Sequence, residues 1–325
     1  MDSSVHVNCF IAILSIIILF MKNISALLRS LRIRSWTKNL FVFAGILFAN
    51  HWNNPKAVII TALGALGFCL LSSSVYLTND IADRKRDMRH PEKKKRPIAS
   101  GELTVAAAAV AAFLLAAIVL TASWILAPTY ALILSTYFVL QMGYTFKLKH
   151  IVILDVLIIA TGFVLRALAG VTLAIDTGYS DVSISHWLIV CTFFLAVFLA
   201  FAKRRSEVIS LGEDAGGHRK ILEEYSVPLL DEMIGIATAA SIIGYSIYTV
   251  SDRTIELVST KLWLTIPFVT YGVFRYLYLI HIKGHGGSPD RLLLSDKPLM
   301  LNILLWTITV ALALSKYPGT ESLPV

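Results

Sequence analysis

Long apolar runs separated by short polar segments are the dominant pattern along the chain. Each run approaches the roughly 20 residues that a helix needs to cross a bilayer. The first run is short, which suggests a tilted or partly interfacial helix, and no stretch remains for a separate soluble domain. The pattern predicts nine membrane-spanning helices, over residues 39–52, 57–79, 104–126, 129–146, 151–175, 186–202, 232–250, 261–281 and 299–316.

The composition agrees with a membrane protein. Of the 325 residues, 56% are hydrophobic and only 15% are charged, and the mean hydropathy is +0.71. A soluble domain carries about 25% charged residues. The expected fold class is therefore all-α, a multi-pass bundle in the membrane. Cys9, Cys69 and Cys191 all lie in apolar runs, so we expect packing roles for them and no disulfide or zinc framework.

Lys and Arg accumulate after every second predicted span, and this sets the expected orientation. The segment 84–97 holds eight Lys or Arg residues and two acids, and further cations follow the fourth and sixth spans. Because positive loops stay in the cytoplasm, these span ends are expected to face it, in a bacterial-type cytoplasmic membrane. The net charge of +8 thus belongs to loops that meet anionic lipid, and it does not indicate nucleic-acid binding.

The first 21 residues form a hydrophobic segment apart from the nine spans. The apolar run 5–21 is preceded by no Lys or Arg, so it lacks the basic region of a signal peptide. One interpretation is an extra N-terminal membrane helix. The other is a natural start at Met21, followed by an amphipathic basic segment through Lys38. In either case the predicted membrane domain covers residues 22–325.

Four oxygen-bearing side chains cluster at the end of the second predicted span. On a helix that advances roughly 100° per residue, Asn79, Asp80, Asp83 and Asp87 fall within an arc of about 100°. A solvated helix end, whose acids offset the cations that follow, would also contain acids. A shared face is not needed for solubility, however, and acids near a bilayer are costly. Since Mg²⁺ takes one or two carboxylates and keeps other positions for phosphate and water, we predict a Mg²⁺ site here.

A cationic loop follows these acids. Pro91 and Pro97 are expected to end the helix, so that residues 93–96 fold back beside the carboxylates. The three lysines of this loop suit a topological anchor, whereas Arg96, restrained by Pro97, is the better phosphate ligand. Lys38, ahead of the first span, either lies at the membrane interface or binds phosphate.

Further ionisable residues occur near the ends of the fourth to sixth spans. Asp155 and Arg166 are eleven residues apart, about 20° of helical rotation, and are expected to share a face. They form either a structural buried pair or an acidic contact plus an anion-binding arginine. Lys203 and Glu207 share a face by their spacing of four. The predicted substrate-binding residues are Lys38, Arg96, Tyr144, Lys147, Lys149, Asp155, Arg166, Lys203, Arg204 and Glu207.

The pattern Asn79-Asp80-x-x-Asp83-x-x-x-Asp87, at the end of the second span, resembles the UbiA superfamily of intramembrane prenyltransferases. The resemblance extends from about Leu28 to nearly the end of the chain. In detail the chain looks most like the decaprenyl-phosphate phosphoribosyltransferase branch. The similar stretches are residues 34–39, 96–101, 144–150 with Asp155, 202–207 and 291–299.

Two departures separate this chain from the aromatic prenyltransferases of the superfamily. Those enzymes typically carry a second DxxxD motif after the sixth span, where this chain reads Lys-Arg-Arg-Ser-Glu over residues 203–207. Their Tyr-x-x-x-Lys pattern is also shifted, because Leu148 stands four residues after Tyr144 and lysines stand at 147 and 149. Both departures favour substrates with more phosphate to neutralise.

The resemblance implies a Mg²⁺-dependent transfer of 5-phosphoribose from phosphoribosyl pyrophosphate to a polyprenyl phosphate, with release of pyrophosphate. It implies catalytic and metal-binding roles for Asn79, Asp80, Asp83 and Asp87. One alternative keeps the fold and transfers a prenyl group from a prenyl diphosphate to an aromatic or other small acceptor. Another is a transporter or lipid-binding protein, which is disfavoured because the acids lie at one rim and the motif has no second copy. An oligomer is compatible with each alternative.

Overall fold

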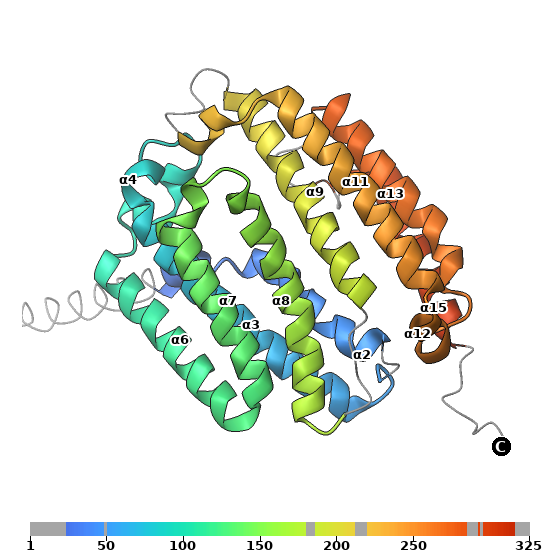
Figure 1. The fold of residues 1–325 in the computed structure, drawn as a ribbon. Helices are drawn as coiled ribbons and strands as arrows, with labels where there is room; N and C mark the ends of the chain where they lie inside the picture. Colours follow the sequence, from blue (N-terminus) through green and yellow to red (C-terminus); the bar gives the residue numbers. More distant parts are fainter. Residues whose placement is uncertain are drawn as a thin grey trace, which may run out of the picture. The chain divides into compact units, whose positions relative to one another are not determined.

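The computed structural model describes residues 24–48, 51–179, 186–211, 220–284, 292 and 295–315. All regular elements in these ranges are helices, so the predicted all-α fold class is confirmed (Figure 1). The chain forms two units, residues 1–39 with 66–126 (unit 1) and residues 40–65 with 127–325 (unit 2). The predicted N-terminal segment 1–21 lies outside the described residues.

Seven described helices are long and apolar enough to cross a membrane. The count of nine spans is therefore not confirmed, although the predicted positions of these seven agree with the structure to within a few residues at most ends. They are Pro55–Ala82 (α3), Val105–Leu126 (α6), Leu154–Asp176 (α8), His186–Leu211 (α9), Val227–Val250 (α11), Ile266–His281 (α13) with the short 3-10 helix Leu262–Thr265 (η6) before it, and Lys297–Ser315 (α15).

The other two predicted spans are not among the seven. The span predicted at 39–52 begins as a 3-10 helix, Ile33–Phe43 (η1), and continues as the short α-helix Ala44–Phe48 (α2). Polar side chains of η1 bind serines of α3: Trp36 donates to Ser73 (3.1 Å) and Asn39 to Ser72 (3.2 Å). The span predicted at 129–146 is the helix Pro128–Phe146 (α7), which agrees with the predicted range to within one residue but is not among these seven.

Unit 1 consists of α6, the second half of α3 and the short elements around them. Ser74 of α3 donates to the Ala112 carbonyl of α6 (2.7 Å), and a small apolar core including Leu77 and Ile98 forms nearby. After α3, the chain forms Arg84–Asp87 (α4), Lys93–Lys95 (η2) and Pro97–Ser100 (α5). Pro97 stands in the first turn of α5, and Gly101 ends it with φ 83°, a left-handed conformation that glycine adopts at little cost.

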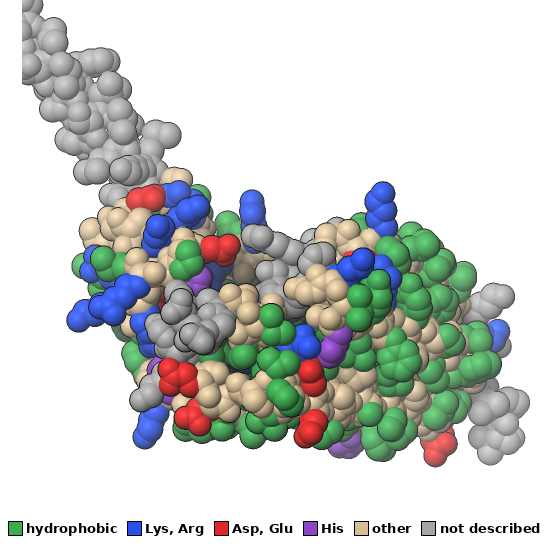
Figure 2. Space-filling view, turned by 90° about the horizontal axis from the view of Figure 1, so that it is seen from above, with side chains coloured by type: hydrophobic (Ala, Val, Ile, Leu, Met, Phe, Trp, Pro, Cys, Tyr) green, Lys and Arg blue, Asp and Glu red, His purple; other side chains and the backbone are tan. Residues whose placement is uncertain are grey.

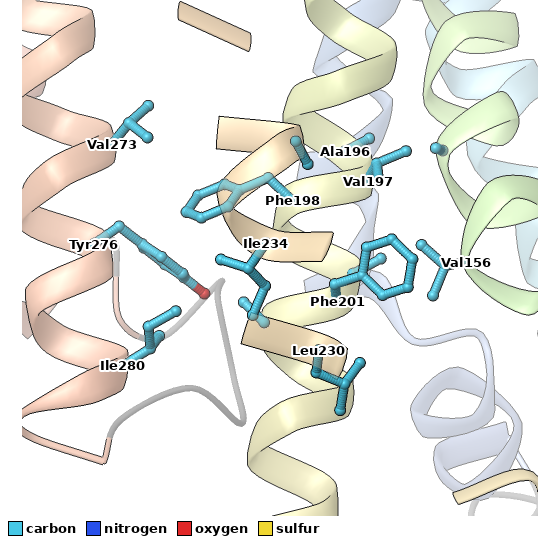
Figure 3. Packing of buried hydrophobic residues seen from close by; sticks show 14 of the residues in the cluster. Val156, Ala196, Val197, Phe198, Phe201, Leu230, Ile234, Val273, Tyr276 and Ile280 are labelled. Carbon is cyan, nitrogen blue, oxygen red and sulfur yellow. The ribbon is translucent and has the colours of Figure 1, made fainter. Parts of the chain in front are cut away.

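The main apolar core of unit 2 lies between α8, α9, α11 and α13. Helix α9 packs along α11, and α8 packs against both α7 and α9. Figure 3 shows Phe198 and Phe201 of α9 between side chains of the neighbouring helices. The Phe198 ring packs edge to face on Tyr276 of α13, with ring centroids 5.3 Å apart. This core holds in place the helix ends that carry Asp155 and Arg204.

The outer surface of α13 and α15 is apolar. Large side chains such as Phe274, Leu301 and Leu312 are exposed, and hydrophobic side chains cover the right-hand side of Figure 2, over these helices. A soluble monomer rarely exposes a large contiguous apolar patch. This surface fits contact with lipid, as expected for an integral membrane protein.

Unit 2 also contains a close approach between residues 42–45 and helix α8. A Cβ atom on Gly170 would overlap the backbone carbonyl of Val42, and one on Gly45 would lie 3.0 Å from the Val171 backbone nitrogen. Small residues let helices in a bilayer pack backbone to backbone. The two glycines therefore hold α2 against α8.

Gly170→Ala is expected to lower the free energy of unfolding of the detergent-purified protein by about 1–3 kcal/mol, because backbone atoms must move to admit the methyl group. Gly235→Ala in α11 is the matched control, since its added methyl meets nothing within 4 Å. Thermal unfolding of both variants measures the difference. Equal unfolding temperatures for the two variants would refute the close approach.

Candidate functional site

The predicted acids of unit 1 lie on two helices. Helix α3 ends at Ala82, Asp83 has φ −92° and ψ 1°, and α4 begins at Arg84. Backbone hydrogen bonds flank this interruption, from the Asp83 nitrogen to the Asn79 carbonyl and from the Asp87 nitrogen to the Asp83 carbonyl (both 2.9 Å). The prediction of one uninterrupted helical face is therefore corrected, because α3 stops between Asp80 and Asp87.

Arg96 nevertheless joins Asp80 and Asp87. Its Nη1 donates to Asp80 Oδ1 at 3.0 Å and to Asp87 Oδ2 at 2.7 Å. Both carboxylates are buried, at 3% and 5% exposure. The predicted fold-back of the cationic loop is thus confirmed by this contact. One cationic nitrogen therefore pairs with two buried carboxylates.

Arg32 is a second cation at Asp80, and sequence reasoning did not identify it. It donates to the same Asp80 Oδ1 atom, and its guanidinium lies over the Tyr76 ring, 5.0 Å from the centroid. Its backbone has a φ of 53°, which is uncommon for a residue other than glycine. No local spacing connects Arg32 with an acid 48 residues away. Together, Asp80, Asp87, Arg96 and Arg32 are called the Asp80 cluster.

The other residues predicted for this region have different surroundings. Asp83 Oδ1 forms an ion pair with Arg86 Nη2 at 3.0 Å, and the Asp83 side chain is 18% exposed. Asn79 and Lys38 are half-buried. Asp80 and Asp87 thus have Arg96 as a shared cationic partner.

The Asp80 cluster fits a divalent ion that also binds substrate. Across the described ranges, no three His, Cys, Asp or Glu side chains are grouped so that they could hold a metal ion. Mg²⁺ at phosphate-binding sites needs only one or two carboxylates, because phosphate and water complete its shell. Two carboxylates that share one cationic nitrogen supply that partial set. The donor chemistry therefore suits an ion that arrives with a phosphate-bearing substrate.

Asp155 is the centre of a second cluster, which lies in unit 2. Its carboxylate is fully buried; Oδ2 accepts from Arg204 Nε at 2.7 Å and Oδ1 accepts from the Tyr225 hydroxyl at 2.8 Å. Arg204 Nη1 donates to Glu207 Oε2 at 2.6 Å. Asp155 lies in the first turn of α8, Arg204 and Glu207 near the end of α9, and Tyr225 just before α11. These four residues and Ile153 are called the Asp155 cluster.

Ile153 contacts the other members of the cluster through its backbone N–H. Its N–H donates to the Tyr225 hydroxyl at 2.7 Å. The residue has φ 68° and ψ −47°, and the Leu154 nitrogen donates to the Val152 carbonyl at 2.7 Å. This is a γ-turn with positive φ at its centre, the rarer and strained form. Burial and the hydrogen bond to Asp155 raise the pKa of Tyr225, so its phenol stays a neutral donor.

Asp155 and Arg166 do not form the buried pair that was one of the two predicted alternatives. The other alternative, an anion-binding Arg166, stays a prediction. Arg166 donates from Nη1 to the Gly162 carbonyl (2.7 Å) and from Nη2 to the Tyr137 hydroxyl (3.0 Å). Its guanidinium also lies over the rings of Tyr137 and Phe163, 5.0 and 5.2 Å from their centroids. Eleven residues span about 16 Å of helix axis. Two side chains on one face are therefore too far apart to pair.

The remaining predicted residues of unit 2 lie near the ends of α7 and α9. Tyr144 is half-buried and interacts electrostatically with Arg204. Lys149 is buried in the 3-10 turn Leu148–His150 (η3), whereas Lys147 and Lys203 are exposed. Glu207 accepts from Arg204. The 285–291 loop, which includes the start of one similar stretch, lies outside the described residues.

Comparisons with known proteins give a consistent result. A family model described as the UbiA prenyltransferase family matches residues 39–285. A decaprenyl-phosphate phosphoribosyltransferase of Mycolicibacterium smegmatis is 32% identical over 302 residues, covering 90% of this chain and 93% of that protein. The protein of the same name from Corynebacterium glutamicum is 31% identical and covers 91% of this chain and 89% of its own length.

Solved structures share the fold. A UbiA homolog from Archaeoglobus fulgidus bound to GPP and Mg²⁺ has a TM-score of 0.67 and 19% identity, covering 89% of this chain and 99% of that one. The same homolog bound to Cd²⁺ has a TM-score of 0.62 and 18% identity, covering 89% and 98%. Divalent metals are thus bound in structural neighbours of this chain.

Proposed function

Because the chain belongs to the UbiA prenyltransferase family, we propose that it is an integral membrane transferase that moves 5-phosphoribose from phosphoribosyl pyrophosphate to a polyprenyl phosphate. The observation that carries this proposal is the similarity, over about nine-tenths of both chains, to proteins called decaprenyl-phosphate phosphoribosyltransferase. In the reaction, an oxygen of the lipid phosphate bonds to C1 of the ribose. The bond from C1 to the diphosphate oxygen breaks, and pyrophosphate leaves with the electron pair.

In this proposal the Asp80 cluster binds the leaving diphosphate. Asp80 and Asp87, with Asn79 and Asp83 of the same motif, would hold Mg²⁺. When bound, the ion would offset the negative charge that develops on the departing diphosphate. Arg96 and Lys38 would donate to the same phosphates, which strengthens binding as their charge grows. Arg96 already lies at the two buried carboxylates, next to where the ion would be held.

The cations of unit 2 would bind a phosphate monoester, either the head group of the lipid or the 5-phosphate of the donor. The candidate donors to this phosphate are Lys147, Lys149, Lys203 and Arg204. Tyr144, Asp155 and Glu207 would orient these donors. Arg166 is a further anion-binding candidate. A phosphate monoester is already an anion at neutral pH. The attack on C1 therefore needs no strong general base. We further propose that residues 22–325 form the transferase domain and that its site faces the cytoplasm, as the positive loops suggest.

Prenyl transfer from a prenyl diphosphate to a small acceptor is the second candidate. It is favoured by the fold shared with a homolog bound to GPP. It is disfavoured by the cations at residues 203–205, where the aromatic prenyltransferases typically have acids.

A donor assay separates the two reactions. Purified protein in detergent with Mg²⁺ is incubated with phosphoribosyl pyrophosphate labelled in the ribose and with polyprenyl phosphate. Label is expected in the organic phase, and chelation of Mg²⁺ should abolish its appearance. A parallel incubation contains labelled prenyl diphosphate and an aromatic acid. Transfer in this second incubation alone would refute the phosphoribosyl proposal.

A further inference from the structure

We propose that Tyr225 is a positioning residue for the transfer reaction: its hydroxyl ties Asp155 to the turn at Ile153 and so fixes the cations that bind a phosphate monoester. This role rests on the proposed transferase function. Tyr225 itself would touch no substrate. It would act through Asp155, Arg204 and the segment that carries Lys147 and Lys149.

The Tyr225 hydroxyl serves two buried partners at once. It donates to Asp155 Oδ1 (2.8 Å) and accepts from the Ile153 nitrogen (2.7 Å). The Asp155 carboxylate is fully buried, and Tyr225 is 4% exposed. Loss of the hydroxyl would leave a buried carboxylate oxygen and a backbone N–H short of a partner, which costs more than the net value of a hydrogen bond.

The turn that Tyr225 holds is strained. Ile153 is β-branched and has a positive φ, a combination that persists only where the surrounding structure enforces it. The turn connects η3, which carries the buried Lys149, with the first turn of α8, which carries Asp155. Tyr225 reaches it from the connection before α11, and its ring packs edge to face on Phe201 of α9. The phenol therefore links three segments of unit 2.

Arg204 is fixed through the same carboxylate. Its Nε and Nη1 donate to Asp155 and Glu207, respectively, and two carboxylates on two nitrogens fix the plane of a guanidinium. No further hydrogen bond of Arg204 is made to another described residue, so Nη2 keeps its capacity to donate to an anion. Rotation of Asp155 after loss of the phenol would move Arg204 with it.

The test is Tyr225→Phe, which removes the hydroxyl and keeps the ring. Initial rates are measured with each substrate varied while the other is saturating. The KM for one phosphate monoester substrate is expected to rise at least tenfold, with kcat changed less than threefold. A rise in the KM for polyprenyl phosphate identifies the lipid head group as the bound phosphate. A rise in the KM for phosphoribosyl pyrophosphate identifies the 5-phosphate of the donor.

Tyr276→Phe is the matched control. Tyr276 is also buried and also packs edge to face on a phenylalanine of α9, Phe198, but it is not part of the Asp155 cluster. Its variant should keep wild-type KM values. A Tyr225→Phe variant whose unfolding temperature falls while both KM values stay at the wild-type level would overturn the positioning role.

A double-variant comparison tests whether Tyr225 acts through Asp155. In the Asp155→Asn background, Tyr225→Phe should change KM less than twofold further, because residues that act as one unit have non-additive effects. Effects that multiply would overturn the role. A wild-type protein that transfers no phosphoribose in the donor assay refutes the proposed function instead. The two failures are therefore distinguishable.

Discussion

Asp87→Asn is expected to lower Mg²⁺-dependent turnover by roughly 10²- to 10³-fold, the size of effect that follows loss of one preorganised electrostatic contact at a reacting group. Asp87 is buried and shares the Arg96 guanidinium with Asp80. Asparagine keeps the shape and removes the charge, so the pair loses half of its negative charge. Turnover is measured as label transferred to lipid across a titration of Mg²⁺. The concentration of Mg²⁺ that gives half-maximal rate should rise.

Glu102→Gln is the matched control for this variant. Glu102 is another acid of unit 1 that accepts from an arginine, Arg29, but it is more exposed than Asp87. Its variant should keep both the rate and the Mg²⁺ dependence of the wild type. An Asp87→Asn variant with wild-type Mg²⁺ dependence would remove this carboxylate from the proposed metal site, whatever its rate.

Asp83→Asn tests whether Asp83 binds the ion, as the sequence pattern predicts. The spacing places Asp83 on the same helical face as Asp87, and we propose that both bind the ion. In the structure, Asp83 is half-buried and contacts Arg86. A loss of Mg²⁺-dependent turnover as large as that of Asp87→Asn is expected. Unchanged turnover would restrict the ion to the Asp80 cluster.

The fold was largely predictable because membrane spans depend on local properties. A run of about 20 apolar residues identifies a span without reference to the rest of the chain, and the run at 104–126 agrees with α6 to within one residue. The span predicted at 39–52 is not confirmed, and there this rule is weaker because the apolar run is short. There, contacts of Trp36 and Asn39 with serines of α3 accompany a 3-10 helix that hydropathy does not reveal.

The candidate site was predictable only where its residues lie close together in sequence. Arg96 follows Asp87 by nine residues, and two prolines indicated that the loop folds back to the acids. Arg32 and Tyr225 were missed because they reach Asp80 and Asp155 over 48 and 70 residues, respectively. Such pairs depend on how helices pack. The same limit applies to Asp155, because its spacing relates it to Arg166 on its own helix, whereas its ion-pair partner is Arg204 on the next one.

Arg204→Gln is expected to destabilise the folded protein by about 3–5 kcal/mol, the usual cost of leaving one member of a buried ion pair alone. The side chains of Arg204 and Asp155 are 3% and 0% exposed. Without Arg204, the Asp155 charge keeps, among the described residues, only the Tyr225 hydroxyl as a side-chain donor. Because membrane proteins often unfold irreversibly, the half-life of the folded protein during heating in detergent is the appropriate measurement. It should shorten by at least tenfold.

Arg205→Gln is the matched control, because Arg205 also forms an ion pair but a less buried one. Its partner is the Asp231 carboxylate, and the two side chains are 13% and 36% exposed. Water screens a partly exposed pair more than a buried one. Arg205→Gln should therefore shorten the half-life less than Arg204→Gln does. Adding Asp155→Asn to Arg204→Gln should restore part of the lost stability, since it removes the unpaired buried charge. Equal losses at Arg204 and Arg205, or no recovery in the double variant, would show that the buried charge does not determine the effect.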